Sequence, residues 1–136
     1  MTYALSGALQ AAVYDLLQSD PGLTAMIGDA VYDAVPGGSL PETYVLLGQE
    51  MAKDASDPEG AGADHRLTLS VITRAPGFST AKGCAAVVCD LLHGAQPTLS
   101  RGHVVDMAFL KATARRIDGA AGRQIDLQFR ARVADA

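Results

Sequence analysis

Tryptophan is absent from the 136-residue sequence, aromatic residues make up 5% of it, and no lysine or arginine precedes Lys53. The late first cation disfavours a secretory signal, and no apolar run reaches the roughly 18 residues that a membrane helix needs. Disorder is excluded as well, because 49% of the residues are hydrophobic and the net charge is only −4. We therefore expect a soluble intracellular protein without a membrane partner, folded as one domain over residues 1–136.

Cysteine and histidine are too few and too scattered for a metal site. Cys84 and Cys89 fall on one expected helix, where a spacing of five turns their side chains about 140° apart. They are thus poorly placed for a disulfide, and zinc would need closer cysteines and two further ligands. His65, His93 and His103 show no metal-ligand spacing. We expect no cofactor and no metal.

Charge is divided unevenly along the chain. Residues 1–64 carry ten acidic side chains and one basic, for a net charge of −9, whereas residues 65–136 carry five acidic and ten basic, for +5. The overall negative charge disfavours polyanion binding by the whole molecule. A basic patch built from the second half stays open, and such asymmetry concerns partners rather than fold.

The first part of the sequence predicts two consecutive helices. Apolar residues recur at helical spacing through residues 3–18 and would bury one face of a helix. Asp20 is a typical capping residue, Pro21 suits the first helical position, and Gly28 suits a helix exit. A second, short helix is therefore expected at residues 21–27.

Strands and one long loop are expected next. Residues 30–35 predict a short strand broken at the Pro-Gly-Gly of 36–38, and the apolar run at 44–47 favours a strand covered on both faces. Residues 51–64 combine glycine, alanine, proline and acidic residues, a composition typical of a long flexible loop. Residues 66–73 alternate between apolar and polar side chains, which predicts a strand with one buried face.

The remainder predicts one helix and a final hairpin. A helix over residues 79–93 would be capped by Ser79. Residues 103–116 have helical propensity, but we favour a strand, because the Asp-Gly at 118–119 is typical of a hairpin connection to the alternating strand at 124–133. Simple alternation in the first of these strands places Val105, Met107 and Phe109 on one face and Val104, Ala108 and Leu110 on the other.

Together these elements predict an α+β fold with a mostly antiparallel sheet and helices packed on one face. The helices are expected to cover the apolar residues of the strands at 66–73 and 124–133. The opposite face carries Arg66, Arg130 and Arg132 and is left for water or for another subunit.

Cys89 and His93 are the best candidates for a nucleophile and its base, because they stand four residues apart on one expected helix. Cys89, however, lies toward the helix C-terminus, where the dipole disfavours a thiolate, and His93 fits that helix end as a structural residue. Nucleophile-elbow, phosphate-loop and dinucleotide motifs are absent from the sequence. We favour a protein that is not an enzyme, with a small enzyme or ligand-binding module using Cys89 and His93 as the alternative.

Basic side chains of the second half form the other candidate site. The set comprises Arg66, Arg115, Arg116, Arg123, Arg130 and Arg132. Proteins that bind single-stranded nucleic acid interleave basic residues with aromatic ones, and here only Phe129 is near, on the expected core face. Solvated strand faces and a subunit or partner interface explain these arginines equally well.

The order of these elements and their short motifs resembles one family, and the resemblance spans almost the whole chain. It rests on the N-terminal helix, Leu23 to Gly28, Val31-Tyr32-Asp33, Pro36, Tyr44 to Gly48, the strand from Arg66 to Thr73, the helix after Gly77, the hairpin from Asp118 to Gln124 and the final strand around Leu127 to Arg130. This pattern is similar to the tail terminator (tail completion) proteins of long-tailed phages, and especially to their relatives in the gene transfer agents of alphaproteobacteria.

The resemblance implies an α+β subunit of a homohexameric ring. Such a ring ends polymerisation of the tail tube and joins the tube to the head-side stopper or connector protein, and DNA passes through its lumen without sequence-specific binding. The protein would be in the bacterial cytoplasm during assembly and then at the head-proximal end of the tail in the virion or gene transfer agent particle. An assembly chaperone, absent from finished particles, is a further alternative.

Two hypotheses connect the residues to this role. A ring needs two different, complementary patches on each subunit, and the acidic first half and basic second half would supply them. Charge reversal at Arg130 or Arg132 should then weaken assembly. The acidic residues of the 51–64 loop would either line the lumen and repel DNA or contact the tube; they are Asp54, Asp57, Glu59 and Asp64. The same residues do not fit the ligand pattern of a calcium loop.

Overall fold

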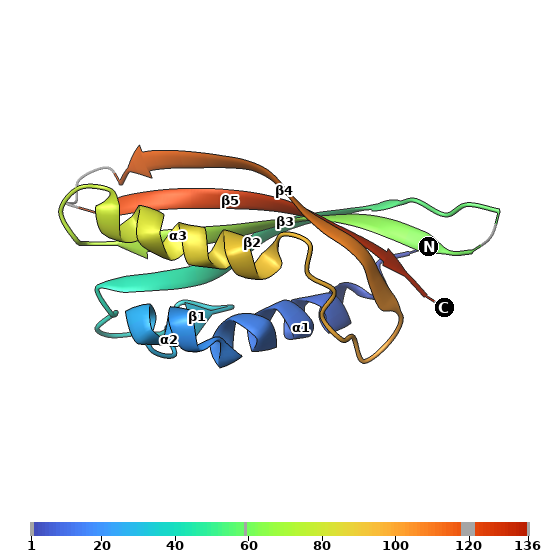
Figure 1. Cartoon of the computed structure of the whole chain (residues 1–136), viewed down its shortest axis with the longest axis horizontal. Helices are drawn as coiled ribbons and strands as arrows, with labels where there is room; N and C mark the ends of the chain where they lie inside the picture. The colour runs from blue at the N-terminus through green and yellow to red at the C-terminus, as the bar shows by residue number, and fades with distance from the viewer. Residues whose placement is uncertain (1, 59, 118–121, 136) are drawn as a thin grey trace.

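Three helices and one five-stranded sheet make up the computed structural model, which describes residues 2–58, 60–117 and 122–135. The elements are, in chain order, α1 (Ser6–Ser19), α2 (Pro21–Ile27), β1 (Val31–Tyr32), β2 (Thr43–Asp54), β3 (Gly62–Thr73), α3 (Ser79–Leu92), β4 (His103–Arg116) and β5 (Arg123–Ala134). The sheet order is β1-β2-β3-β5-β4, with β1 parallel to β2 and the other neighbours antiparallel (Figure 1). This confirms the predicted α+β fold and the predicted order of elements.

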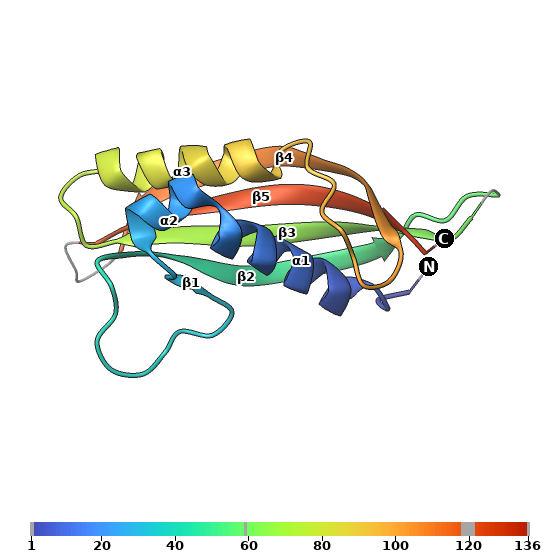
Figure 2. The same cartoon turned by 60° about the horizontal axis from the view of Figure 1, so that its bottom comes forward.

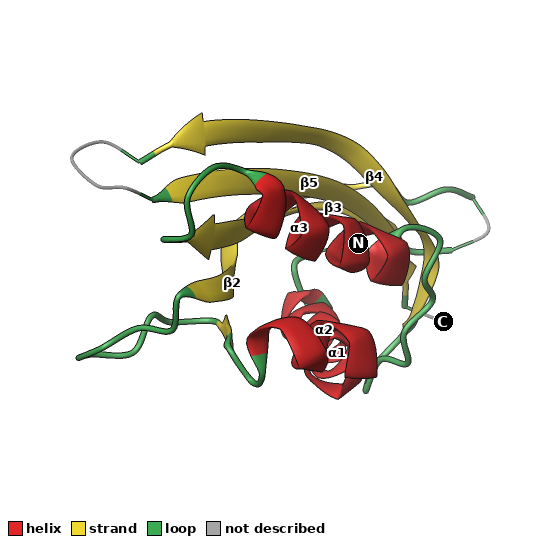
Figure 3. Cartoon of the chain, turned by 60° about the vertical axis from the view of Figure 1, so that its left-hand side comes forward, coloured by secondary structure: helices red, strands yellow, loops and turns green. Residues whose placement is uncertain are grey.

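The helices lie together on one face of the sheet (Figure 3). The core, made of buried side chains from both layers, lies between them. β3 and β5 lie at the middle of the sheet and supply its most buried side chains, among them Leu69, Val71, Leu127 and Phe129. These are the residues that the alternating patterns assigned to the covered face. In the part of the chain that the structure describes, the opposite face carries no helix, as predicted.

α1 and α2 form where the sequence predicts them. α1 buries Leu9 and Leu17 on its core side. The Asp20 carboxylate accepts a hydrogen bond of 2.8 Å from the backbone N–H of Leu23 and thereby caps α2. Gly28 ends α2 with a φ of 63°, a conformation that other residues rarely adopt.

α3 also matches its prediction closely, with one difference at its start. The N-cap is Phe78 rather than Ser79, which is the first residue of the helix, and Phe78 makes no side-chain capping bond. The Phe78 ring instead lies under the Arg123 guanidinium, 5.3 Å from its centroid. None of the helices in the described ranges is long and apolar enough to span a bilayer.

β1 is shorter than predicted and β2 is longer. Residues beyond Tyr32 leave the sheet, whereas β2 continues well past the predicted 44–47. Val45 is fully buried against the helices, but Tyr44 and Leu46 are only half-buried, so the expectation of cover on both faces is wrong for the chain alone. The rings of Tyr44 and Tyr32 lie with their centroids 5.9 Å apart, which explains why this side of the strand is apolar.

The expected loop at 51–64 is mostly a β-hairpin. Residues 51–54 continue β2 and residues 62–64 begin β3, with Lys53 opposite Asp64. The ends of the connection are held by a 2.9 Å hydrogen bond from the Ala55 N–H to the Gly62 carbonyl. Backbone pairing forms this hairpin with few apolar side chains, so the composition indicated a loop instead. The hairpin extends beyond the helices at the end of the molecule where the chain termini lie (Figure 1).

β4 is a strand, as favoured, but its side chains do not alternate simply. The register with β5 shifts near Val105 and again near Leu110, each shift placing one extra residue in β4. Val104 and Met107 consequently both lie on the buried side, which contradicts the predicted division into two faces. β4 and β5 pair antiparallel up to Arg116 and Arg123, which confirms the predicted hairpin. Residues 118–121 lie outside the described ranges.

Candidate functional site

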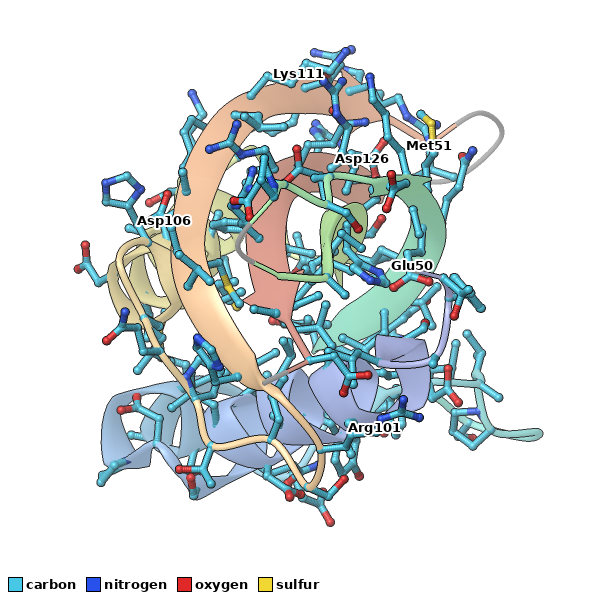
Figure 4. The ribbon with its side chains drawn as sticks, turned by 90° about the vertical axis from the view of Figure 1, so that its right-hand side faces the viewer. Glu50, Met51, Arg101, Asp106, Lys111 and Asp126 are labelled. Carbon is cyan, nitrogen blue, oxygen red and sulfur yellow. The ribbon has the colours of Figure 1, made fainter. Side chains whose placement is uncertain are left out.

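Four of the six candidate arginines lie on the helix-free face of the sheet. Arg66 on β3 is directly opposite Arg130 on β5, and Arg132 is opposite Asp64. Arg115 reaches the same face from β4, where it pairs in register with Gln124. Figure 4 shows Lys111, Asp126 and Met51 on this side of the sheet, opposite α1. Around these residues the face is therefore polar and mixed in charge, with cations in excess.

Arg132 and Arg130 contact acidic residues of their own chain. The Arg132 guanidinium donates a 3.0 Å hydrogen bond to the Ala55 carbonyl and lies 3.8 Å from the Asp57 carboxylate and 4.0 Å from that of Asp64. Arg130 lies 3.9 Å from the carboxylate of Asp106. Arg132 and the hairpin acids, predicted to meet different partners, thus come together within one subunit.

The other hairpin acids are less involved. Asp54 stands at the end of β2, and its carboxylate accepts a 2.7 Å hydrogen bond from the Ser56 hydroxyl. Glu59 lies outside the described residues. Asp57 at the hairpin tip is exposed, but Arg132 lies beside it and beside Asp64, and Lys53 pairs in register with Asp64, so the local negative field is weakened.

Arg115 helps to stabilise the ionised form of the Asp126 carboxyl group. Partial burial of the Asp126 carboxyl group opposes ionisation, but hydrogen bonds from Gln124 and Ser70 and the Arg115 guanidinium at 3.7 Å together lower its pKa below the ordinary value of 3.8. Asp126 therefore stays ionised at neutral pH and fixes the polar side chains around it on the sheet face.

Arg116 and Arg123 do not join this group. They lie opposite each other at the end of the β4–β5 hairpin, and their pairing places both on the helix side of the sheet. Arg123 stacks on Phe78 at the start of α3, whereas Arg116 is exposed at the margin. The six arginines thus form a set of four on one face and a pair at one end.

Among the described residues, no hydrogen bond joins the Cys89 thiol to the His93 ring. Burial and the neighbouring Asp90 carboxylate raise the pKa of the Cys89 thiol, and burial raises that of Cys84 to about 11. His93 Nδ1 accepts a 3.0 Å hydrogen bond from the backbone N–H of Phe109. Its ring therefore links the end of α3 to β4. Within the described residues, no cluster of three or more potential metal ligands is found.

Sequence reasoning missed a polar cluster around Glu50. The Glu50 carboxylate accepts hydrogen bonds from the Tyr3 hydroxyl, from the Ser6 hydroxyl at 2.7 Å and from His65 Nδ1 at 3.2 Å. His65 is fully buried, and its ring stacks on that of Tyr3 with centroids 6.0 Å apart. The four residues come from three separate segments of the sequence, and the mostly polar residues at 49–54 gave no signal of burial. The cluster fastens the N-terminal segment to β2 and β3.

Comparison with known proteins extends over nearly the whole chain. The family described as "Tail completion protein gp17" matches residues 11–134. Among solved structures, a chain from "Virion of native gene transfer agent (GTA) particle" is similar to this one, with 58% sequence identity and a TM-score of 0.92. That likeness covers 98% of this chain and 99% of the virion chain. A search of curated proteins gave no match.

Proposed function

Because the chain belongs to the tail completion protein gp17 family, we propose that it is a structural subunit of a phage-like tail. In this proposal, copies of the chain form a homohexameric ring that ends polymerisation of the tail tube and joins the tube to a head-side connector protein. The observation that carries it is the end-to-end similarity, at 58% identity, to a chain of a gene transfer agent virion. The protein would act in the bacterial cytoplasm during assembly and then stay at the head-proximal end of the tail.

The two margins of the sheet support a ring. A closed ring joins one surface of a subunit to a different surface of the next, so the subunit needs two unlike patches. β4 forms one margin of the sheet and carries Lys111, Arg115 and Arg116, whereas the margin at β1 carries Asp29 and Asp33. Part of the division of charge along the sequence thus becomes a difference in charge between opposite margins.

DNA would pass through the ring without sequence-specific binding. The helix-free face mixes cations with Asp126 and neutral polar side chains, and Arg132 is already engaged by Asp57 and Asp64. The aromatic residues described on this face, Tyr32 and Tyr44, pack on each other at the β1 margin. They are not interleaved with the arginines, as aromatic residues are in proteins that hold single strands. We assign the hairpin tip to contact with the tube rather than to repulsion of DNA, because its own arginine neutralises part of its charge.

A deletion strain tests the proposal. Cells that make the particles but lack this chain should yield heads without joined tails and tubes of irregular length, and the wild-type gene should restore complete particles. A Cys89→Ala variant should restore them equally well, because the thiol has no role in a structural ring. Normal particles from the deletion strain, or failure of Cys89→Ala with a normally folded chain, would refute the proposal and favour the enzyme alternative.

A further inference from the structure

The second half of β4 is not covered by the helices. Every residue from 109 to 116 is exposed, including Phe109 at 38% and Leu110 at 41%. β4 is also the last strand of the sheet order, so the backbone groups along its outer side have no neighbouring strand. A lysine and a bulge on an edge strand, here Lys111 and the register shift near Leu110, hinder pairing with a strand of another chain and so limit aggregation. They do not explain why two large apolar side chains stay uncovered beside them.

A groove of matching character lies at the opposite margin. It is lined by Gly7, Gln10, Ala11, Tyr14, Asp15 and Asp33, which come from α1 and from the residue after β1. The α1 residues are mostly small or neutral, and the two carboxylates are exposed. Figure 2 shows β4 and the segment that follows β1 at opposite margins of the molecule.

The groove and the exposed part of β4 stand at the same level along the strands. Register pairs run across the sheet from Tyr32 through Leu46, Ser70 and Asp126 to Thr113. Asp33 follows Tyr32, so it stands level with the middle of the exposed segment of β4. Rotation about an axis roughly parallel to the strands brings opposite margins together at equal height, which is the geometry of a ring.

We propose that the 109–115 segment of β4 in one copy docks in the α1–β1 groove of the next copy. Phe109 and Leu110 would bury apolar surface against the small residues of α1, and Lys111 and Arg115, which lie on the helix-free side of β4, would face Asp33 after β1. Charge complementarity and equal height select a second copy of the chain as the occupant. This inference rests on the proposed ring and names its contact surfaces.

Cross-linking of engineered cysteines tests this contact. In a Cys89→Ala background, Ala11→Cys marks the groove and Ala112→Cys marks β4, while Cys84 is buried and unreactive. A short bis-maleimide, applied to the purified chain and to assembled particles, should link the double variant into a ladder of oligomers. A mixture of the two single variants should give dimers only, and either variant alone should give none.

Charge reversal provides a second readout that does not depend on linker geometry. Lys111→Glu should weaken self-association by about tenfold, and adding Asp33→Lys in the same chain should restore it. Lys82→Glu, on the exposed side of α3, is the matched control and should leave association unchanged.

Three results would overturn the inference. If rings form but the cross-linked ladder is absent and Lys111→Glu has no effect, the proposed contact between β4 and the groove is refuted, while the proposed ring still holds. A link from Ala112→Cys to the tube protein instead of to the Ala11→Cys copy would make the tube the occupant of the contact. A chain that stays monomeric both in solution and in particles would refute the inference and the ring together.

Discussion

Glu50 illustrates how single polar residues organise this small fold. Its carboxylate gathers hydrogen bonds from the N-terminal segment, α1 and β3, beside a fully buried histidine. A buried carboxylate is costly unless it is well hydrogen-bonded. Here burial opposes the charged form, but the bonds from Tyr3, Ser6 and His65, with the charge of His65, outweigh it and hold the pKa of Glu50 below its ordinary value of 4.5.

The first prediction concerns acid stability. Because the pKa of Glu50 is lower in the folded chain than in the unfolded chain, its contribution to stability is complete above pH 4.5 and is lost as the pH falls through the folded value. Glu50→Gln should lower the free energy of unfolding by about 1–2 kcal/mol at pH 7, with the difference shrinking in acid. Urea denaturation of the monomer across pH 3–7 measures this effect. Glu42→Gln, which removes an exposed carboxylate, is the control; equal pH profiles for the two variants would contradict the assignment.

The second prediction concerns Gly102, which precedes β4. It has a φ of 69°, and an added Cβ would lie 2.5 Å from the Ala134 carbonyl oxygen and 2.7 Å from Leu5 Cδ1. Gly102→Ala should therefore cost at least about 3 kcal/mol of stability.

Gly94 has a similar φ of 77°, but no atom lies within 4 Å of an added Cβ, so Gly94→Ala should cost about 1 kcal/mol. Gly37→Ala, without either constraint, should change stability by less than about 0.5 kcal/mol. Thermal unfolding of the three variants tests this order, and equal losses would contradict it.

At the scale of elements, the helices and the central strands were predictable because their signals are local. Periodic apolar residues predicted α1 and α3, the capping residue Asp20 predicted α2, and strict alternation of apolar and polar residues predicted β5. Each of these signals depends on residues only a few positions apart, and tertiary packing favours the same element as the local pattern.

Elements whose form depends on distant neighbours were not predictable in detail. The β2–β3 hairpin is held by backbone pairing rather than by apolar side chains, so its composition indicated a loop. The bulges of β4 arise from its pairing with β5, which no local pattern reveals. The candidate arginines were split for the same reason, since register and bulges decide which face each side chain occupies.

The third prediction concerns the link between α3 and β4. His93→Ala removes the acceptor for the Phe109 N–H and should cost about 1 kcal/mol of stability. Amide hydrogen exchange at Phe109 should accelerate markedly, while amides in β3 change little. His93→Asn offers an oxygen near the same position and should recover part of the protection. Unchanged exchange at Phe109 in His93→Ala would show that the imidazole does not hold β4.

At the scale of the whole molecule, the two margins of the sheet differ in charge and in shape. The β1 margin is acidic and grooved, and the β4 margin is basic, apolar in part and uncovered by helices. The net charge of −4 conceals this arrangement, because it averages two opposite surfaces. A subunit of this kind favours head-to-tail contact with its own copies over symmetric pairing.

Cryo-electron microscopy of particles purified from cells that make the chain tests the central proposal most directly. The account predicts a ring of six copies at the head-proximal end of the tail tube, with β4 of each copy against α1 of the next. A particle without the chain, or with the chain elsewhere than at the junction of tube and head, would contradict it.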